Sequence, residues 1–426
     1  MKLLAEGYPM VMFGEDWGAH PSSSQHLAKE LSKFHDITWI NSIGLRSPKF
    51  NFNDIKRVMD KCKAMMGASN RSGTEQNLRP TSSWSPMVVD PVALPFHGQS
   101  WVRKLNQKLI ADRLYGCNQA LEKQKPILWL SLPSAVPLLG KINECFSIYY
   151  CGDDFSALEG VDHDVVDQLE KELVEKVDLI IVASDNLRRK FPREKTVFIP
   201  HGVADYFFEA PDERPRDLPE GPVAGFYGSI SGWFDQQLLI RTARLLPHWN
   251  FAIIGPQRCF VEHLRREPNI YLLGEKEHHE LPNYVHHWQV SILPFRDNAQ
   301  IRACNPLKLR EYMAVGKPIV STDFPALAPY KKWVNVVEHS TRAEPIRDTK
   351  AEQFAHEIET AAAEGTAPDH LMLNTANVDF FEAIGDWKDI DRIRRRQQRR
   401  AKQVADETWT ARAIKIEREI ANRINK

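Results

Sequence analysis

The segment NPLKLREYMAVGKPIVST, residues 305–322, predicts a helix that runs directly into a buried strand. Asn305 is a residue type that caps helix N-termini, and Pro306 suits the first helical position. Gly316 can end the helix in the left-handed conformation, and Pro318 then opens a short apolar strand. A helix of about three turns that leads into a buried strand is half of a parallel α/β unit.

Similar apolar runs occur on both sides of this segment, and stretches with helical periodicity separate them. One such stretch, residues 164–177, places its apolar side chains at three-and-four spacing, as a crossover helix does. The runs occupy residues 9–13, 36–41, 126–132, 146–151, 178–184, 196–200, 223–229, 250–255, 269–274, 290–295 and 318–322. They predict an α/β protein with two doubly wound, Rossmann-like domains in tandem.

A change of composition marks the expected domain boundaries. Residues 201–222 are rich in proline and charge and lack periodicity, which is typical of an interdomain linker. We therefore expect an N-terminal domain over residues 1–200 and a C-terminal domain over residues 223–385. Residues 386–426 begin with a basic run and continue with apolar side chains at helical spacing, which predicts a basic, amphipathic helical tail.

The overall composition excludes several classes of protein. The chain of 426 residues carries 56 Lys and Arg and 56 Asp and Glu, and this balance argues against a general nucleic-acid binder. Its 42% hydrophobic and 26% charged residues exclude the disordered, collagen-like and disulfide-scaffold classes. The six cysteines form no CxxC pair, and no signal-peptide core or membrane-spanning stretch is visible. We expect a cytoplasmic protein with reduced thiols.

The start of the helix predicted at Asn305 is a candidate anion site. First-turn N–H groups and the positive end of the helix dipole attract an anion, and Lys308 adds a full charge. Glu311 follows on the same face, where a carboxylate can accept hydrogen bonds from a diol such as a ribose. The alternative is a capped helix with an ordinary Lys308–Glu311 surface pair.

Residues 305–322, together with IPHGV at 199–203, resemble nucleotide-sugar-dependent glycosyltransferases of the GT-B fold. Three further segments are similar to a bacterial subgroup that includes teichuronic acid and exopolysaccharide glycosyltransferases. They are HPSSSQHLAKEL (20–31), YYCGDDFSALEGVD (149–162) and GFYGSISGWFDQQLL (225–239).

The resemblance implies that the C-terminal domain binds the donor nucleotide, with Lys308 on the diphosphate and Glu311 on the ribose. It implies that the other donor-binding residues are Gly228, Ser229, Ile230, Phe295, Asn305, Leu307 and Leu309. Retaining enzymes that resemble this chain have two glutamates eight positions apart. Glu311 matches the second of them, but the position of the first is occupied by Ala303. Inversion of the anomeric carbon is therefore favoured over retention.

Two residues are candidates for catalysis. Asp153, next to Asp154, follows the strand predicted at 146–151, at the strand end where parallel sheets bind ligands. Resemblance to an inverting, xanthan-type glucuronosyltransferase implies that Asp153 is the general base for an acceptor hydroxyl. The alternative is that both aspartates are helix caps or turn formers. His20 precedes the first predicted helix and can touch the donor phosphate or the acceptor. The alternative is that this segment only starts the helix, with Ser22 as its N-cap.

Other clusters suggest a metal ion or a membrane. The histidine pairs 278–279 and 286–287 lack the neighbouring ligands of a metal site, so a solvated face is favoured and no metal ion or permanent cofactor is expected. Two basic helices can dock an anionic membrane, and the alternative for each is a core-packed helix with a solvated basic face. The residues concerned are Arg392, Arg394, Arg395, Arg396, Arg399 and Arg400 in the tail, and Trp101, Arg103, Lys104, Leu105, Lys108 and Leu109 in a helix that begins near Ser100.

These observations predict a bacterial, metal-independent, hexosyl-type glycosyltransferase of the cell envelope. The expected donor is a UDP-sugar, favoured over GDP, and the expected acceptor is a growing surface polysaccharide or a lipid-linked saccharide. The enzyme would work in the cytoplasm, attached peripherally to the inner face of the membrane, without nucleic acid as a partner. The alternative is a non-catalytic GT-B scaffold that binds nucleotide sugar or glycan and assists a partner enzyme.

Overall fold

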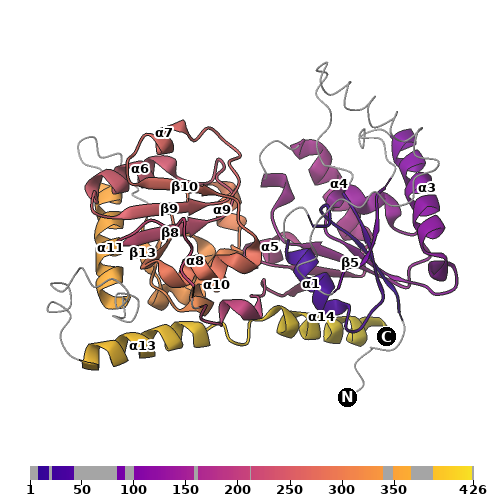
Figure 1. Cartoon of the computed structure of the whole chain (residues 1–426). Helices are drawn as coiled ribbons and strands as arrows, with labels where there is room; N and C mark the ends of the chain where they lie inside the picture. The colour runs from indigo at the N-terminus through magenta and orange to yellow at the C-terminus, as the bar shows by residue number, and fades with distance from the viewer. Residues whose placement is uncertain are drawn as a thin grey trace. The chain divides into compact units, whose positions relative to one another are not determined.

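The computed structural model describes residues 8–18, 22–42, 84–91, 100–157, 162–211, 213–338, 349–365 and 387–424 (Figure 1). These residues form two compact units. The first unit contains the described residues of Met1–Pro200 and of Arg412–Lys426, and the second contains those of His201–Ala411. Residues 201–222 thus belong to the second unit, and the tail that begins at 386 is divided between the two.

The first unit is built on a seven-stranded parallel sheet with the order β3-β2-β1-β4-β5-β6-β7. Its strands are β1 (Met10–Phe13), β2 (Ile37–Ile40), β3 (Met87–Val89), β4 (Ile127–Leu130), β5 (Phe146–Cys151), β6 (Leu179–Val182) and β7 (Thr196–Phe198). Most strands are buried along their whole length, as expected for a parallel sheet covered on both faces. The strand order reverses between β1 and β4.

Helices connect the strands of this sheet, and one of them is the predicted crossover helix. They are α1 (Ser23–Leu31), η1 (Gln119–Glu122), η2 (Pro133–Leu138), η3 (Phe155–Ala157), α3 (Ser100–Cys117), α4 (His163–Lys176) and α5 (Asp185–Lys190). In α4, Asp162 caps the start by accepting from the Val165 N–H, and the predicted face at Leu169 and Leu173 is buried. In α3 the buried face is Val102, Ile110 and Leu114.

Two apolar residues of α3 do not pack in the core. Trp101 is 61% exposed and Leu105 is 38% exposed, so neither belongs to the face that α3 buries. One face of α3 therefore packs in the core, as the alternative to membrane docking predicts, but Trp101 and Leu105 lie outside that face. Lys104 and Lys108 are exposed along the same helix.

The second unit contains a six-stranded parallel sheet with the order β10-β9-β8-β11-β12-β13. Its strands are β8 (Val223–Tyr227), β9 (Asn250–Ile254), β10 (Ile270–Gly274), β11 (Val290–Leu293), β12 (Ile319–Thr322) and β13 (Asn335–Val337). Here the order reverses between β8 and β11. Both sheets have the doubly wound order, which confirms the predicted fold class of two Rossmann-like domains.

The helices of the second unit pack on its sheet or on one another (Figure 1). They are η4 (Asp205–Phe207), α6 (Gln236–Leu245), α7 (Glu262–Arg265), η5 (His278–Glu280), α8 (Leu281–His287), α9 (Ala299–Ala303), α10 (Leu307–Val315), η6 (Pro325–Trp333), α11 (Thr349–Gly365) and α13 (Trp387–Lys402). The indole of Trp288, which ends α8, lies directly on Gly225 of β8. A Cβ at Gly225 would be 1.7 Å from Trp288 Cε3, so glycine is required for this contact.

The helix predicted with Asn305 as its cap is present, but its cap and its first helical residue each lie one position later. Helix α10 starts at Leu307 and Pro306 is the cap residue, so the prediction of Asn305 as N-cap was wrong. The Asn305 Oδ1 instead accepts a 2.6 Å hydrogen bond from Arg310 Nη1. The predicted end is confirmed, because Gly316 is left-handed with φ 82°.

The basic tail forms α13 and α14 (Trp409–Ile424), and its arginines differ in environment. Arg400 is 1% exposed and donates to the backbone carbonyls of Gly316 and Trp333, so its assignment to a membrane-facing surface was wrong. The exposed arginines of α13 are Arg392, Arg394, Arg395, Arg396 and Arg399. None of the described helices has the sustained apolar stretch that a membrane span needs.

Candidate active site

The carboxyl ends of β8 and β11 bring together two of the predicted donor-binding residues. Gly228 directly follows β8 and has φ 133°, a conformation that favours glycine. The Lys308 side chain, from the first turn of α10, lies against it. A Cβ at Gly228 would be 2.7 Å from Lys308 Cε and 2.9 Å from Lys308 Nζ. The strand order reverses at this point, which is where doubly wound sheets bind ligands.

Aromatic rings surround the Lys308 ammonium. Its Nζ lies 5.0 Å from the ring centroid of Trp233, 5.4 Å from that of Phe226 and 5.7 Å from that of Phe295. Ring faces attract a cation through their quadrupoles and carry no net charge. They therefore hold the ammonium in place beside Gly228.

The first turn of α10 adds a second positive element. The cap residue, Pro306, offers no side-chain acceptor to the N–H groups of this turn, and no side-chain cap is present. Leu307 and Lys308 are half-buried, and Leu309 is fully buried. An uncapped helix start beside an ammonium group is suited to a phosphate.

Glu311 lies one turn further along α10 and is 2% exposed. Its Oε2 accepts a 2.5 Å hydrogen bond from the Tyr227 hydroxyl, and its Oε1 is 2.8 Å from His278 Nε2. The Tyr206 hydroxyl in turn bonds His278 Nδ1. The alternative of an ordinary surface pair is wrong, because the Glu311 carboxylate is buried in a polar network. Burial and the charge of Glu311 raise the pKa of Tyr227 well above its ordinary value.

His278 does not lie on a solvated face. Its side chain is 16% exposed and contacts Glu311, so the prediction of a solvated histidine was wrong at this position. Tyr206, Tyr227 and His278 were all absent from the predicted site. Only Tyr227 had a signal in the sequence, because it ends the strand that precedes Gly228.

Backbone hydrogen bonds hold two more of the predicted donor-binding residues. Ile230 is 1% exposed, its N–H donates to the Pro256 carbonyl and its carbonyl accepts from the Arg258 N–H. Phe295 is 1% exposed and its N–H donates to Thr322 Oγ1 at 3.1 Å. Ser229 is half-buried between these anchored points. The loop after β8 is therefore held rigidly.

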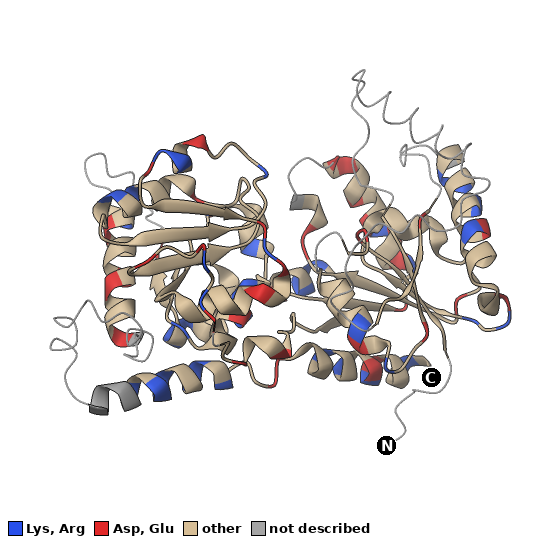
Figure 2. Cartoon of the chain, viewed as in Figure 1, with Lys and Arg blue, Asp and Glu red and all other residues tan. Residues whose placement is uncertain are grey.

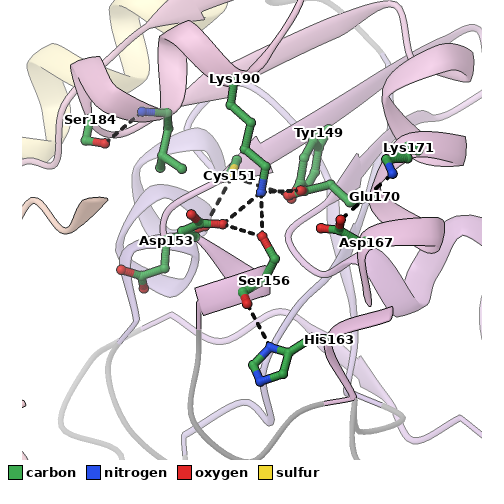
Figure 3. A network of polar contacts seen from close by, with 12 residues as sticks. Tyr149, Cys151, Asp153, Ser156, His163, Asp167, Glu170, Lys171, Ser184 and Lys190 are labelled. Carbon is green, nitrogen blue, oxygen red and sulfur yellow. Dashed lines mark hydrogen bonds and ion pairs between the residues drawn. The ribbon is translucent and has the colours of Figure 1, made fainter. Parts of the chain in front are cut away.

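In the first unit, the two aspartates that follow β5 have separate environments (Figure 3). Asp154 Oδ1 accepts 2.7 Å and 2.8 Å hydrogen bonds from Lys190 Nζ and Ser156 Oγ. Burial alone would raise the pKa of Asp154, but these hydrogen bonds outweigh it and hold the pKa below its ordinary value. Asp153 is exposed, and its backbone carbonyl accepts from the Cys151 thiol at 3.2 Å.

Lys190 connects this loop to the core of the first unit. Its ammonium is 2.7 Å from Glu170 Oε2, and the other oxygen of Glu170 accepts from the Tyr149 hydroxyl at 2.7 Å. Burial would lower the pKa of Lys190, but its hydrogen bonds to Asp154 and Glu170 raise it above the ordinary value. The ammonium thus has carboxylates on two sides, and the loop that carries Asp153 is fixed.

The second predicted catalytic residue, His20, lies outside the described residues. Ser22 is the N-cap of α1 and accepts from the Gln25 N–H at 3.3 Å, as its alternative role predicts. Within the described ranges, no three His, Cys, Asp or Glu side chains are grouped as metal ligands. Metal independence stays a prediction.

Comparison with known proteins identifies the second unit. Residues 221–364 match the family model of the glycosyl transferases group 1. These residues are thus similar to the group 1 glycosyltransferases over part of the chain. The match contains every predicted donor-binding residue from Gly228 to Glu311, and it contains Tyr227 and His278 as well.

A curated relative matches about half of the chain, and solved structures extend the likeness in fold to nearly all of it. TuaH of Bacillus subtilis (strain 168), a glycosyltransferase named for teichuronic acid biosynthesis, is 28% identical over 228 residues, which are 48% of this chain and 57% of TuaH. Anabaena HepE, solved with UDP and glucose, aligns over 99% of this chain and all of its own, with 13% identity and a TM-score of 0.60. Sucrose-phosphate synthase of Thermosynechococcus elongatus aligns over 98% and 99%, with 14% identity and a TM-score of 0.62.

The structural likeness establishes the GT-B fold that the sequence predicts. The second unit joins Gly228 and Lys308 in direct contact, with Phe295 beside the Lys308 ammonium. Asn305 is set apart from this group, because Arg310 holds its side chain and Asn305 is 4% exposed.

Proposed function

We propose that this chain is a glycosyltransferase that transfers a sugar from a UDP-sugar to a saccharide acceptor. The observation that carries the proposal is the contact of Lys308 with the backbone of Gly228, beside the buried Glu311, at the strand-order reversal of the second unit. A cation and an uncapped helix start recognise a diphosphate, and a carboxylate recognises a sugar diol.

The proposed donor contacts follow from this arrangement. Lys308 binds the diphosphate, Leu307 and Leu309 present backbone groups near it, and Glu311 binds the ribose. The rigid loop at Gly228, Ser229 and Ile230 lies against the nucleotide, and Phe295 supports the ammonium. UDP is proposed rather than GDP, and the solved complex of HepE with UDP and glucose, on the same fold, supports that choice.

The proposed chemistry is inverting transfer with Asp153 as the general base. As the acceptor oxygen bonds to the anomeric carbon, its proton passes to the Asp153 carboxylate. The bond between the anomeric carbon and the β-phosphate oxygen breaks, and UDP leaves with the electron pair. Lys308 and the positive end of α10 stabilise the charge that develops on that phosphate, which is the role a metal ion has in other transferases.

The acceptor is proposed to be a growing surface polysaccharide or its lipid-linked precursor. The likeness to TuaH supports a role in the cell envelope. Lys and Arg positions recur along α13 (Figure 2), where five arginines are exposed, and α3 carries exposed Trp101 together with exposed Lys104 and Lys108. Both features suit peripheral attachment to an anionic membrane. Sedimentation with phosphatidylglycerol vesicles tests this, and binding that is unchanged when the exposed α13 arginines become glutamine would contradict it.

Calorimetric titration with UDP and GDP tests the donor site. We expect UDP to bind the wild-type chain and to bind Lys308→Ala and Glu311→Ala much more weakly. Absence of binding to either nucleotide would refute the proposal. Incubation with UDP-sugars and a lipid-linked acceptor then tests transfer, and an inverted product anomer is expected. UDP binding without any transfer would favour the non-catalytic scaffold.

A further inference from the structure

Four polar side chains of the second unit form a hydrogen-bonded chain that includes Glu311, the proposed ribose ligand. It contains Tyr206 from η4, His278 from η5, Glu311 from α10 and Tyr227 from β8. These elements are far apart in sequence and meet only in the folded unit. The inference below rests on the proposed function, because it concerns how Glu311 meets the donor.

The hydrogen-bond directions in this chain follow from its chemistry. An ionised carboxylate only accepts, so His278 Nε2 must carry the proton that it shares with Glu311 Oε1. In a neutral imidazole the other nitrogen is then an acceptor, and the Tyr206 hydroxyl supplies the donor. Burial and the charge of Glu311 raise the pKa of Tyr206, which keeps that hydroxyl protonated. Tyr206 therefore selects the tautomer of His278 that can donate to Glu311.

The two donors hold the carboxylate from both ends. His278 binds Oε1 and Tyr227 binds Oε2, so the plane of the Glu311 carboxylate cannot rotate without breaking one of the bonds. Tyr227 is itself fixed, because its N–H donates to the Tyr312 hydroxyl at 3.0 Å. A diol is recognised through two hydroxyls at a set spacing, and a carboxylate of fixed orientation recognises it best.

We propose that His278, oriented by Tyr206, is a positioning residue that holds Glu311 for the ribose hydroxyls of the donor. The pair thereby sets the preference of the site for ribonucleotides over nucleotides that lack these hydroxyls. His278 acts through Glu311 and makes no contact with the reacting atoms in this proposal.

The test compares the affinities of the full chain for UDP and for 2′,3′-dideoxy-UDP. The wild-type chain should prefer UDP by roughly tenfold to a hundredfold, the range of a hydrogen bond to a charged group. In His278→Ala most of this preference should be lost, with the affinity for dideoxy-UDP nearly unchanged. A general structural defect would weaken both ligands equally.

Three further variants complete the design. His278→Gln should keep most of the preference, because its amide can donate to Glu311 and accept from Tyr206. Tyr206→Phe should lower the preference by roughly threefold to tenfold, since only the support of His278 is lost. His279→Ala is the matched control, because His279 is the adjacent histidine and is exposed.

The outcomes separate this inference from the proposed function. A wild-type chain that binds neither nucleotide would refute both. UDP binding with the same preference in wild type and His278→Ala would refute only the role of His278. Tighter UDP binding by His278→Ala would also refute it, since the ring would then compete with the nucleotide. If His278→Ala does not fold, Tyr206→Phe decides, and an unchanged preference in that variant overturns the proposal.

Discussion

Substitution of Gly228 by alanine tests the geometry of the proposed diphosphate site most directly. The new Cβ would lie 2.7 Å from Lys308 Cε, much closer than carbon atoms pack, so the lysine side chain must move. At φ 133° an alanine is also strained, which costs about 1–3 kcal/mol of folding free energy. The substitution therefore displaces Lys308 without removing its charge from the chain.

The expected loss of affinity follows from the contact that Lys308 makes. A hydrogen bond to a charged group contributes about 1.5–3 kcal/mol, and 1.4 kcal/mol corresponds to a factor of ten. Gly228→Ala should thus bind UDP roughly tenfold to a hundredfold more weakly in calorimetric titration. In a Lys308→Ala background the same substitution should have almost no further effect on UDP affinity.

Gly140 provides the matched control. It has φ 71° and no atom lies within 4 Å of the position of its Cβ, so Gly140→Ala introduces backbone strain without a collision. Thermal unfolding should show a loss of stability in both variants, and only Gly228→Ala should lose UDP affinity. A folded Gly228→Ala that binds UDP as tightly as wild type would refute the proposed placement of Lys308 at the diphosphate.

Three further predictions follow from buried or paired charges. Asp153→Asn should lower the initial rate of transfer by roughly a hundredfold to ten-thousandfold, with UDP affinity unchanged. Asp154→Asn should keep most of the rate. Equal rates in the two variants would contradict the assignment of Asp153 as the base. Lys190→Met should destabilise the first unit by about 2–4 kcal/mol in denaturant unfolding, because buried Glu170 loses its cation. The folded state raises the pKa of Lys190 above 10.5, so the stability that Lys190 contributes is complete below pH 10.5 and is lost as the pH rises further. The wild-type chain should therefore lose this stability in strong alkali, and Lys190→Met should not. Burial lowers the pKa of Lys317 from 10.5 to about 8. Between pH 8 and pH 10.5 the unfolded chain therefore binds more protons than the folded chain, and the free energy of unfolding should rise with pH. Lys317→Met should abolish this rise and should be more stable than wild type at neutral pH by an amount on the order of 3 kcal/mol.

The order of elements was predictable because each signal is local. Apolar runs, a proline before a strand and a glycine after a helix depend on neighbouring residues alone, and Gly316 ends α10 as predicted. The start of α10 was misplaced because Pro306 suits both a cap and a first helical position. The choice depends on Arg310, which holds Asn305 away from the helix N-terminus.

Part of the donor site was predictable from topology. Gly228 and Lys308 meet because the ends of β8 and β11 lie at one edge of the sheet, and α10 starts near that edge. The support of Glu311 by Tyr206 and His278 was not predictable in this way. Its contacts join a loop before the sheet to a short helix after β10, and no periodicity relates such positions.

The arginines of α13 illustrate a similar limit. A basic run at helical spacing predicts a charged face, but the spacing does not identify which cation finds acceptors inside the protein. Arg400 is buried because the carbonyls of Gly316 and Trp333 accept from it, whereas Arg392 and Arg399 are exposed. The pKa of Arg400 is lowered by this burial to about 10.

The two adjacent aspartates after β5 show how structure separates residues that sequence cannot. A general base must reach the acceptor and must not be occupied by a permanent cation. Lys190 and Ser156 bind Asp154, and the same ammonium binds Glu170 in the core, so Asp154 holds the loop in place. Asp153 is exposed on a loop that is anchored one residue away. The anchored neighbour therefore fixes the loop, and the exposed Asp153 beside it is the residue that we propose as the general base.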